Sequence, residues 1–334
     1  MFAKVRGNTK VTTMFDRCLS LYAAGPRNIQ SMASTTTMIN SPAVAIASIN
    51  NICKRLHSTM VDPIIDMQQL QNKLVELSPD IATSLTERGY YTTSSILPSN
   101  IIRTMRSQSI NLRHQGRFEQ SWSERIDSST GSVVRFDKEG VFACEPDGRD
   151  YDVAPDLIVY MSVLLQTLPT VLCEQSLPTS EVQLSNQSFN AKLAVTSPGG
   201  SVYPLHIDNP QGVSAGDTRK LTCILYLNPD YEPDDGGEIR LYLDGGKKKE
   251  GKTMKEKTDK EDLDILDLTP VGGRLLAFWS DEIPHEVLAT APMADGKDEK
   301  FDRYALTIWI PTENYLSLHN YSSKFSHLRD LAFP

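Results

Sequence analysis

The chain has 334 residues and a mass of 37.2 kDa, which suits one large domain or two small ones. Its 40% hydrophobic and 23% charged residues exclude collagen, coiled coils and wholly disordered chains. The net charge of −8 and the pI near 5.3 argue against nucleic acid as the main partner. No apolar run approaches the roughly 20 residues that a bilayer span needs, so we expect no membrane segment.

Residues 1–60 differ from the rest of the chain, because they hold seven basic residues and a single acid, Asp16, among many Ser, Thr, Ala and Asn residues. This composition is typical of a mitochondrial or plastid transit segment, and a plain disordered extension is the alternative. We therefore set this segment apart from the fold.

Helical patterns follow over residues 62–188, which we expect to support a catalytic domain and to contain its first strands. Asp62 can cap a helix whose first position is Pro63. A second helix is expected to begin at Ser99, and a third to run from Pro155 to about Leu168. The apolar residues at helical spacing in the first helix are Ile64, Met67, Leu70, Leu74 and Leu77.

From about residue 189 the chain changes to short β-rich runs separated by turn residues. The clearest runs span 193–196, 221–227, 238–243, 274–279 and 304–310. Such runs predict a jelly roll over 189–312, and the preceding helices make the fold class α+β. Residues 313–334 are expected to be a C-terminal tail. The Lys-dense segment 244–264 predicts a solvated loop, with a docking loop as the alternative.

The chemical signal begins at His206 and Asp208, because residues i and i+2 of a strand face the same way. His285, which follows another apolar strand, is the natural third ligand. Two imidazoles and one carboxylate leave three positions of a cation open, which favours non-haem Fe(II) over structural zinc with its four protein ligands.

Arg303 opens the last β-rich run, whose alternation places Ala305, Thr307 and Trp309 on the same face as Arg303. The guanidinium either reaches solvent or pairs with a carboxylate in the barrel, since a buried cation needs an anionic partner. With the metal-ligand pattern upstream, a dicarboxylate co-substrate is the better account. Tyr226 could donate its hydroxyl to the same carboxylate.

Six ordered blocks now carry a family resemblance: residues 203–210, 221–228, 236–241, 273–281, 284–287 and 303–309. The sequence resembles the Fe(II)/2-oxoglutarate dioxygenases, and within them the prolyl 4-hydroxylases that modify hypoxia-inducible factor. The resemblance implies a double-stranded β-helix in which His206, Asp208 and His285 hold iron. It further implies that Arg303 and Tyr226 hold the distal carboxylate of 2-oxoglutarate.

The remaining site residues are likewise implied by the resemblance. The pocket lining falls on Tyr203, Ile224, Thr307 and Trp309. Residues around the substrate fall on Arg219, Arg135 and Asp137. The cofactors and co-substrates implied are Fe(II), 2-oxoglutarate, O2 and L-ascorbate.

The function expected from this resemblance is 2-oxoglutarate-dependent 4-hydroxylation of a proline in a protein partner, with oxygen sensing as its use. A hydroxylase of small molecules and a non-catalytic barrel used for binding are the alternatives. The resemblance implies the cytoplasm or nucleus, whereas residues 1–60 favour import into an organelle.

Overall fold

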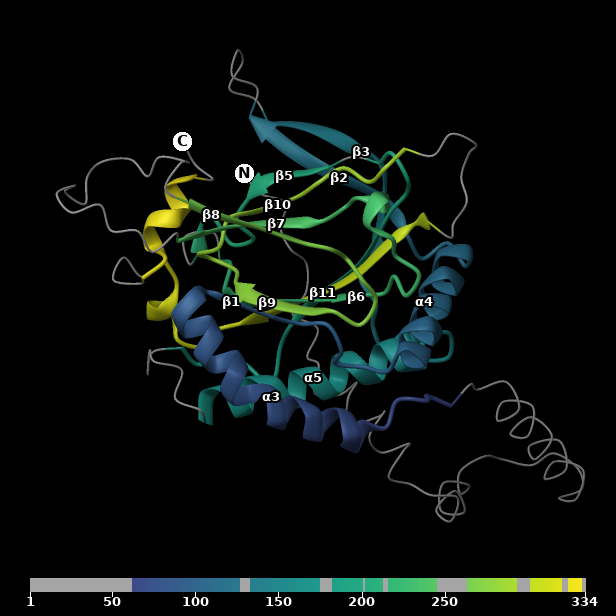
Figure 1. Cartoon of the computed structure of the whole chain (residues 1–334), viewed down its shortest axis with the longest axis horizontal. Helices are drawn as coiled ribbons and strands as arrows, with labels where there is room; N and C mark the ends of the chain where they lie inside the picture. Colours follow the sequence, from purple (N-terminus) through teal and green to yellow (C-terminus); the bar gives the residue numbers. More distant parts are fainter. Residues whose placement is uncertain are drawn as a thin grey trace, which may run out of the picture.

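Two antiparallel sheets face each other, and helices cover the outer face of the larger sheet (Figure 1). The computed structural model describes residues 62–126, 133–174, 182–200, 202–212, 216–244, 263–292, 301–319 and 324–331. The predicted transit segment and nearly all of the Lys-dense loop lie outside these residues. The prediction of an α+β fold with a jelly-roll core is confirmed.

The larger sheet has seven strands, with the order β1-β9-β6-β11-β4-β3-β2. The facing sheet has four, with the order β5-β10-β7-β8. The bounds of the seven strands, in that order, are Tyr90–Thr93, Leu275–Trp279, Arg219–Tyr226, Arg303–Pro311, Asn190–Thr196, Val133–Cys144 and Glu119–Ile126. Those of the four are Tyr203–His206, His285–Val287, Ile239–Asp244 and Leu263–Leu268.

Strand β11 shows how the sequence pattern builds both layers. Tyr304, Leu306, Ile308 and Ile310 alternate along it and are almost completely buried. The Arg106 guanidinium of α4 (Ser99–His114) lies over the Tyr304 ring, so this face of the strand meets the helices. The opposite face, which begins with Arg303, therefore points between the two sheets, where a site can form.

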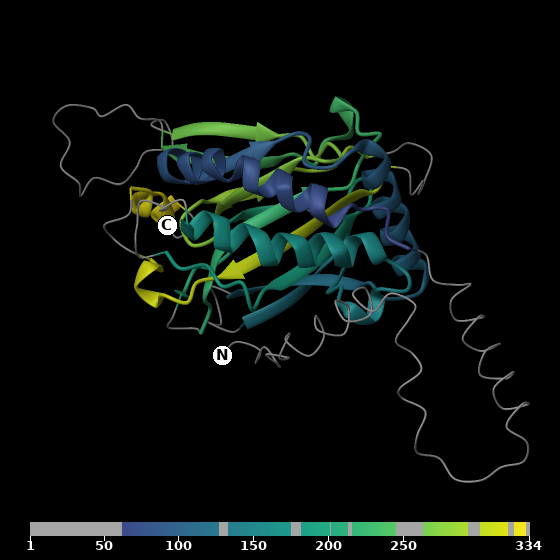
Figure 2. The same ribbon diagram turned by 90° about the horizontal axis from the view of Figure 1, so that it is seen from below.

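The helical layer consists of α4, α3 (Met67–Arg88) and α5 (Pro155–Glu174), and Figure 2 shows α3 and α5 side by side beneath the larger sheet. Helix α5 contacts both other helices and β11. Leu157, Leu164 and Leu168 are wholly buried in it. The indole of Trp279 in β9 donates to the carbonyl of Leu85 at 3.0 Å, which ties α3 to the sheet.

The predicted start of the first helix is wrong. Helix α3 begins at Met67, and its cap is Asp66, whose side chain accepts from the Gln69 N–H at 3.0 Å. Residues 62–66 are held differently, because the Ile64 and Ile65 N–H groups both donate to the buried Asp156 carboxylate at 2.8 Å. A distant partner thus outweighs the local capping signal of Asp62 and Pro63.

Helix α5 also corrects two expectations. It starts at Pro155 as predicted but continues past Pro169 to Glu174. Its 20 residues are long and apolar enough to cross a bilayer by length and composition, contrary to the expectation from the sequence. Most of the helix is buried inside the protein, as in a core helix.

The segment after β11 packs against the barrel. It contains the short helices Tyr315–Ser317 and Ser326–Leu331, and its Phe325 and Leu328 are buried. The Ser317 carbonyl accepts from the buried Lys220 ammonium at 3.1 Å. His319 Nε2 is 2.8 Å from the Asn209 carbonyl. This segment therefore braces the loop that follows β5.

We expect Asp156→Ala to lower the free energy of unfolding by about 2–3 kcal/mol, because two backbone donors and the Gln108 amide lose their buried acceptor. Urea denaturation measures the loss. Asp62→Ala is the control, since Asp62 is exposed. Equal stability of the two variants would contradict this account of residues 62–66.

Candidate functional site

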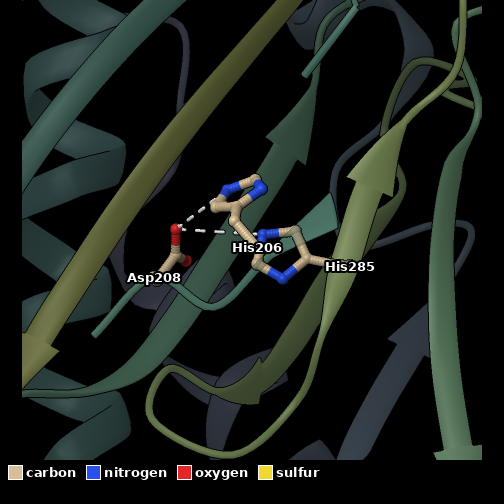
Figure 3. A group of neighbouring side chains, drawn as sticks. All are labelled: His206, Asp208 and His285. Carbon is tan, nitrogen blue, oxygen red and sulfur yellow. Dashed lines mark ion pairs between the residues drawn. The ribbon is translucent and has the colours of Figure 1, made fainter. Parts of the chain in front are cut away.

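His206, Asp208 and His285 converge between the sheets (Figure 3). Asp208 Oδ1 is 3.7 Å from His206 Nε2 and 3.8 Å from His285 Nε2. One ligand atom of each residue lies within 4.8 Å of the other two. A single cation can therefore contact all three residues at once.

The register of the smaller sheet brings the two histidines together. His206 is the last residue of β5, His285 is the first of β10, and the two are direct antiparallel partners. Asp208 lies beyond the end of β5, so the expectation that it shares a strand with His206 is wrong. The bend after β5 turns its carboxylate back toward the rings.

Backbone carbonyls fix the orientation of both rings. His206 Nδ1 lies 2.7 Å from the Pro204 oxygen, and His285 Nδ1 lies 3.0 Å from the Ile283 oxygen. A carbonyl only accepts, so Nδ1 carries the proton in each ring and Nε2 keeps its lone pair. Both Nε2 lone pairs are thus available to a cation. In histidine metal sites the other ring N–H commonly donates to an acceptor of the protein, as it does here.

The Asp208 carboxylate is held from the larger sheet. Its Oδ2 accepts from Thr222 Oγ1 at 2.7 Å and from Trp309 Nε1 at 2.9 Å. Thr222 and Trp309 are register partners on β6 and β11. Because both donors bind Oδ2, Oδ1 remains free toward the histidines.

Protonation favours a ligand set with neutral imidazole and ionised carboxylate. Burial and the His285 ring lower the pKa of His206 to about 4, against the attraction of Asp208. Burial would raise the pKa of Asp208, but the two rings, Arg219 and the Trp309 indole outweigh it and lower that pKa. The residues present therefore fit a divalent metal with three positions left for other ligands.

A second feature between the sheets is the Arg303 side chain, which is 8% exposed. Its Nε donates to the Gly237 carbonyl at 2.7 Å, and no carboxylate of the described residues pairs with the guanidinium. Gly237 has a φ of +75°, and a Cβ there would lie 2.7 Å from Arg303 Cδ, so glycine permits this approach.

Tyr226 lies beside this guanidinium, with the Arg303 Cζ 5.2 Å from the centre of its ring. Its buried hydroxyl has no hydrogen-bond partner among the described residues. Burial raises the pKa of Tyr226, although Arg303 opposes the effect, so the hydroxyl stays a donor. A buried cation and an unused donor side by side fit the carboxylate of a small ligand.

Three of the other predicted pocket residues share the inner face of the larger sheet, and the fourth, Tyr203, lies on the smaller sheet. Ile224 and Thr307 are register partners, and each lies two residues along its strand from the pair of Tyr226 and Ala305. Tyr203 begins β5. Trp309 lies nearer the metal ligands and contacts Asp208, so its role is to position a ligand as well as to line the pocket. The ligand and pocket assignments themselves stay predictions.

The three residues predicted around the substrate lie in two places. Arg219 binds the Asp217 carboxylate and donates to the Asp208 backbone carbonyl, so its guanidinium supports the ligand loop. Arg135 and Asp137 are exposed on β3. The Arg135 guanidinium lies over the Trp122 ring at 4.3 Å.

Sequence reasoning missed three residues of this site: Thr222, Lys138 and Lys192. The role of Thr222 follows from strand alternation, which puts it on the face of Ile224 and Tyr226, but its partner Asp208 could not be read from spacing. The two lysines approach Tyr203 from β3 and β4, and only the register of the folded sheets reveals this.

Comparison with known proteins agrees with this geometry. Residues 191–311 match the model of the 2OG-Fe(II) oxygenase superfamily. This region carries all three converging residues, Arg303 and Tyr226, and it forms a 2OG-Fe(II) oxygenase domain. Members of that superfamily use Fe(II), 2-oxoglutarate and O2.

Within the superfamily, the domain is similar to a prolyl hydroxylase. It is 35% identical over 121 residues to prolyl hydroxylase EGLN3 of Homo sapiens, covering 36% of this chain and 38% of that protein. It is 34% identical over 126 residues to human Egl nine homolog 1, covering 37% and 23%. The chain thus spans less than two-fifths of the length of these relatives.

The fold is shared with a Trichoplax adhaerens prolyl hydroxylase solved with a peptide of the hypoxia inducible factor oxygen degradation domain. That match has 24% identity and a TM-score of 0.52, covering 76% of this chain and 97% of the solved one.

We expect Thr222→Val to weaken binding of Mn(II), used as an inert probe metal, by roughly 10-fold, because Asp208 loses one of the two donors that orient it. Titration of the metal-free protein measures the affinity. Thr92→Val is the control, since the buried Thr92 hydroxyl has no described partner. Unchanged affinity in Thr222→Val would show that Trp309 alone orients the carboxylate.

Proposed function

We propose that this protein is an Fe(II)/2-oxoglutarate-dependent prolyl 4-hydroxylase that acts on a proline in a protein partner. The observation that carries the proposal is the presence, between the same two sheets, of a three-residue metal-ligand set and a buried guanidinium that lacks a carboxylate among the described residues. An enzyme that places a dicarboxylate beside a metal needs both features.

His206, Asp208 and His285 would hold the metal, and Arg303 with Tyr226 would hold the distal carboxylate of 2-oxoglutarate. When bound, the metal and co-substrate supply oxidative decarboxylation coupled to hydroxylation of a carbon–hydrogen bond. The protein orients these groups and does not itself supply the redox chemistry.

Apolar side chains pack beside the metal ligands and Arg303. The Phe278 ring packs on its edge against His285, with 4.7 Å between ring centres. Ile224 and Ala305 are buried on the face that carries Tyr226 and Thr307. Exclusion of water strengthens the interaction of Arg303 with a carboxylate, because the local dielectric constant is lower.

The choice of a peptidyl proline is supported by the relative EGLN3, which is named as a prolyl hydroxylase. The Trichoplax enzyme, which shares the fold, was solved with a peptide of a hypoxia inducible factor. A role in oxygen sensing, stimulation by L-ascorbate and residence in the cytoplasm or nucleus belong to the same proposal.

The direct test is succinate release by the Fe(II)-loaded full chain with 2-oxoglutarate and a panel of proline-containing peptides, compared with a panel of small metabolites. We expect peptides to stimulate succinate release and to gain one oxygen atom by mass spectrometry. His206→Ala should abolish both signals, because one of the three ligands is lost. Stimulation by metabolites alone would replace the proposal with a small-molecule hydroxylase.

We expect Arg303→Gln to raise the 2-oxoglutarate concentration needed for half-maximal succinate release by roughly 100-fold, since the carboxylate loses its charged partner. Arg240→Gln is the matched control, because Arg240 pairs with Asp267 on the smaller sheet, away from the Arg303 side chain. A co-substrate requirement that does not change in Arg303→Gln would assign the carboxylate to another cation.

A further inference from the structure

Two lysines meet at one aromatic ring beside the metal ligands. Lys138 Nζ of β3 lies 3.6 Å from the centre of the Tyr203 ring, and Lys192 Nζ of β4 lies 5.9 Å from it. Lys138 is only 8% exposed, and Lys192 is half-buried. Neither residue belongs to the metal-ligand set, and neither contacts Arg303, although the Tyr203 ring that they share is one of the predicted pocket residues.

Both ammonium groups lack a counter-charge in direct contact. Among the described residues, neither ammonium group forms an ion pair or a hydrogen bond, and each lies over the face of the Tyr203 ring. Lys220, which is buried to a similar degree, contacts both Asp281 and Glu282. Burying an ammonium without such partners costs free energy, and placing a second one nearby adds to that cost.

The pKa values reflect this cost. Burial and the charge of Lys192 lower the pKa of Lys138 to about 8. Burial also lowers the pKa of Lys192, while Asp208 and Glu145 act in the opposite direction without contacting it. An anion bound between the two ammonium groups would relieve both effects.

The sheet register places Lys192 on the inner face that also carries the donors to Asp208. Lys192 is the partner of Thr307, which is in turn the partner of Ile224, so all three residues share the inner face of the larger sheet. Tyr203 lies on β5, three residues before His206. A group held by the lysines would therefore lie close to the reacting centre.

The surroundings of the pair continue to the surface of the protein. Val202, next to Tyr203, is 46% exposed, and Trp122 on β2 is 42% exposed. Strands β2 and β3 extend beyond the smaller sheet in Figure 1. The ring that both lysines contact therefore lies one residue from the surface at Val202, whereas the co-substrate carboxylate has Arg303 and Tyr226.

We propose that Lys138 and Lys192 form a subsite for the carboxylate of an acidic peptide residue close to the hydroxylated position. The proposal rests on the proposed function, because it assumes a peptide substrate. It assigns to this pair a preference for acidic sequence that the metal centre and Arg303 do not provide.

The test uses two short fluorescent peptides with one central proline, flanked by aspartates in one and by asparagines in the other. Anisotropy measures their binding to the full chain loaded with Mn(II) and 2-oxoglutarate, so the readout needs no turnover. We expect the aspartate peptide to bind at least about 10-fold more tightly, as charge-assisted contacts imply. This ratio should fall toward one in Lys138→Gln and in Lys192→Gln.

Two variants serve as controls. Lys138→Arg keeps the charge and should keep most of the preference, which separates loss of charge from damage to the fold. Lys73→Gln removes a lysine of α3 that pairs with Glu76, and it should leave the ratio unchanged.

A preference that survives in both glutamine variants would overturn the proposal, as would equal binding or no binding of the two peptides by the unaltered protein. Failure of the proposed function has a different signature, because it would appear as succinate release that no peptide stimulates, whatever the anisotropy ratio.

Discussion

The site depends above all on the orientation of one carboxylate. Thr222 and Trp309 bind Asp208 Oδ2 from the larger sheet, whereas His206 and His285 lie on the smaller one. Asp208 thus connects the two sheets at the point where the cation would bind. If this carboxylate rotated, the histidines would keep their backbone hydrogen bonds but lose the third member of the set. The distance between the two sheets therefore decides whether the three ligand atoms can meet at one cation.

The inner face of the larger sheet arranges its functions along the strand direction. The cross-strand pair of Thr222 and Trp309 supports the metal ligands, and the pair of Tyr226 and Ala305 lies next to Arg303. Lys192, on the neighbouring strand β4, is the partner of Thr307, which lies between these two pairs along β11. Strand alternation keeps these side chains on one side, while the opposite side packs on the helices. If a strand of this sheet slipped by one residue, its functional side chains would point toward the helices instead of toward the smaller sheet.

Much of this arrangement could be predicted from the sequence. The β-rich runs, the order of the motifs and the alternation of β11 indicated the jelly roll and the burial of Arg303. The contacts that depend on distant residues could not be predicted. Asp156 fixes residues 64 and 65 from about 90 positions away, which moved the start of the first helix. Lys138 and Lys192 approach each other only because both reach the Tyr203 ring of β5, and no local pattern marks a lysine as buried.

The brace between His319 and Asn209 spans 110 positions of the sequence. Asn209 directly follows Asp208, so the ligand loop is secured by a residue made long after it during translation. The nascent chain can form the helices and the first strands of the barrel as they emerge, since local contacts form early. Arg219 can support the ligand loop early, whereas the contact from His319 forms only when residue 319 arrives. The three converging residues cannot all be present before His285 has been made, and the brace from His319 is made later still, so the complete site requires nearly the whole chain.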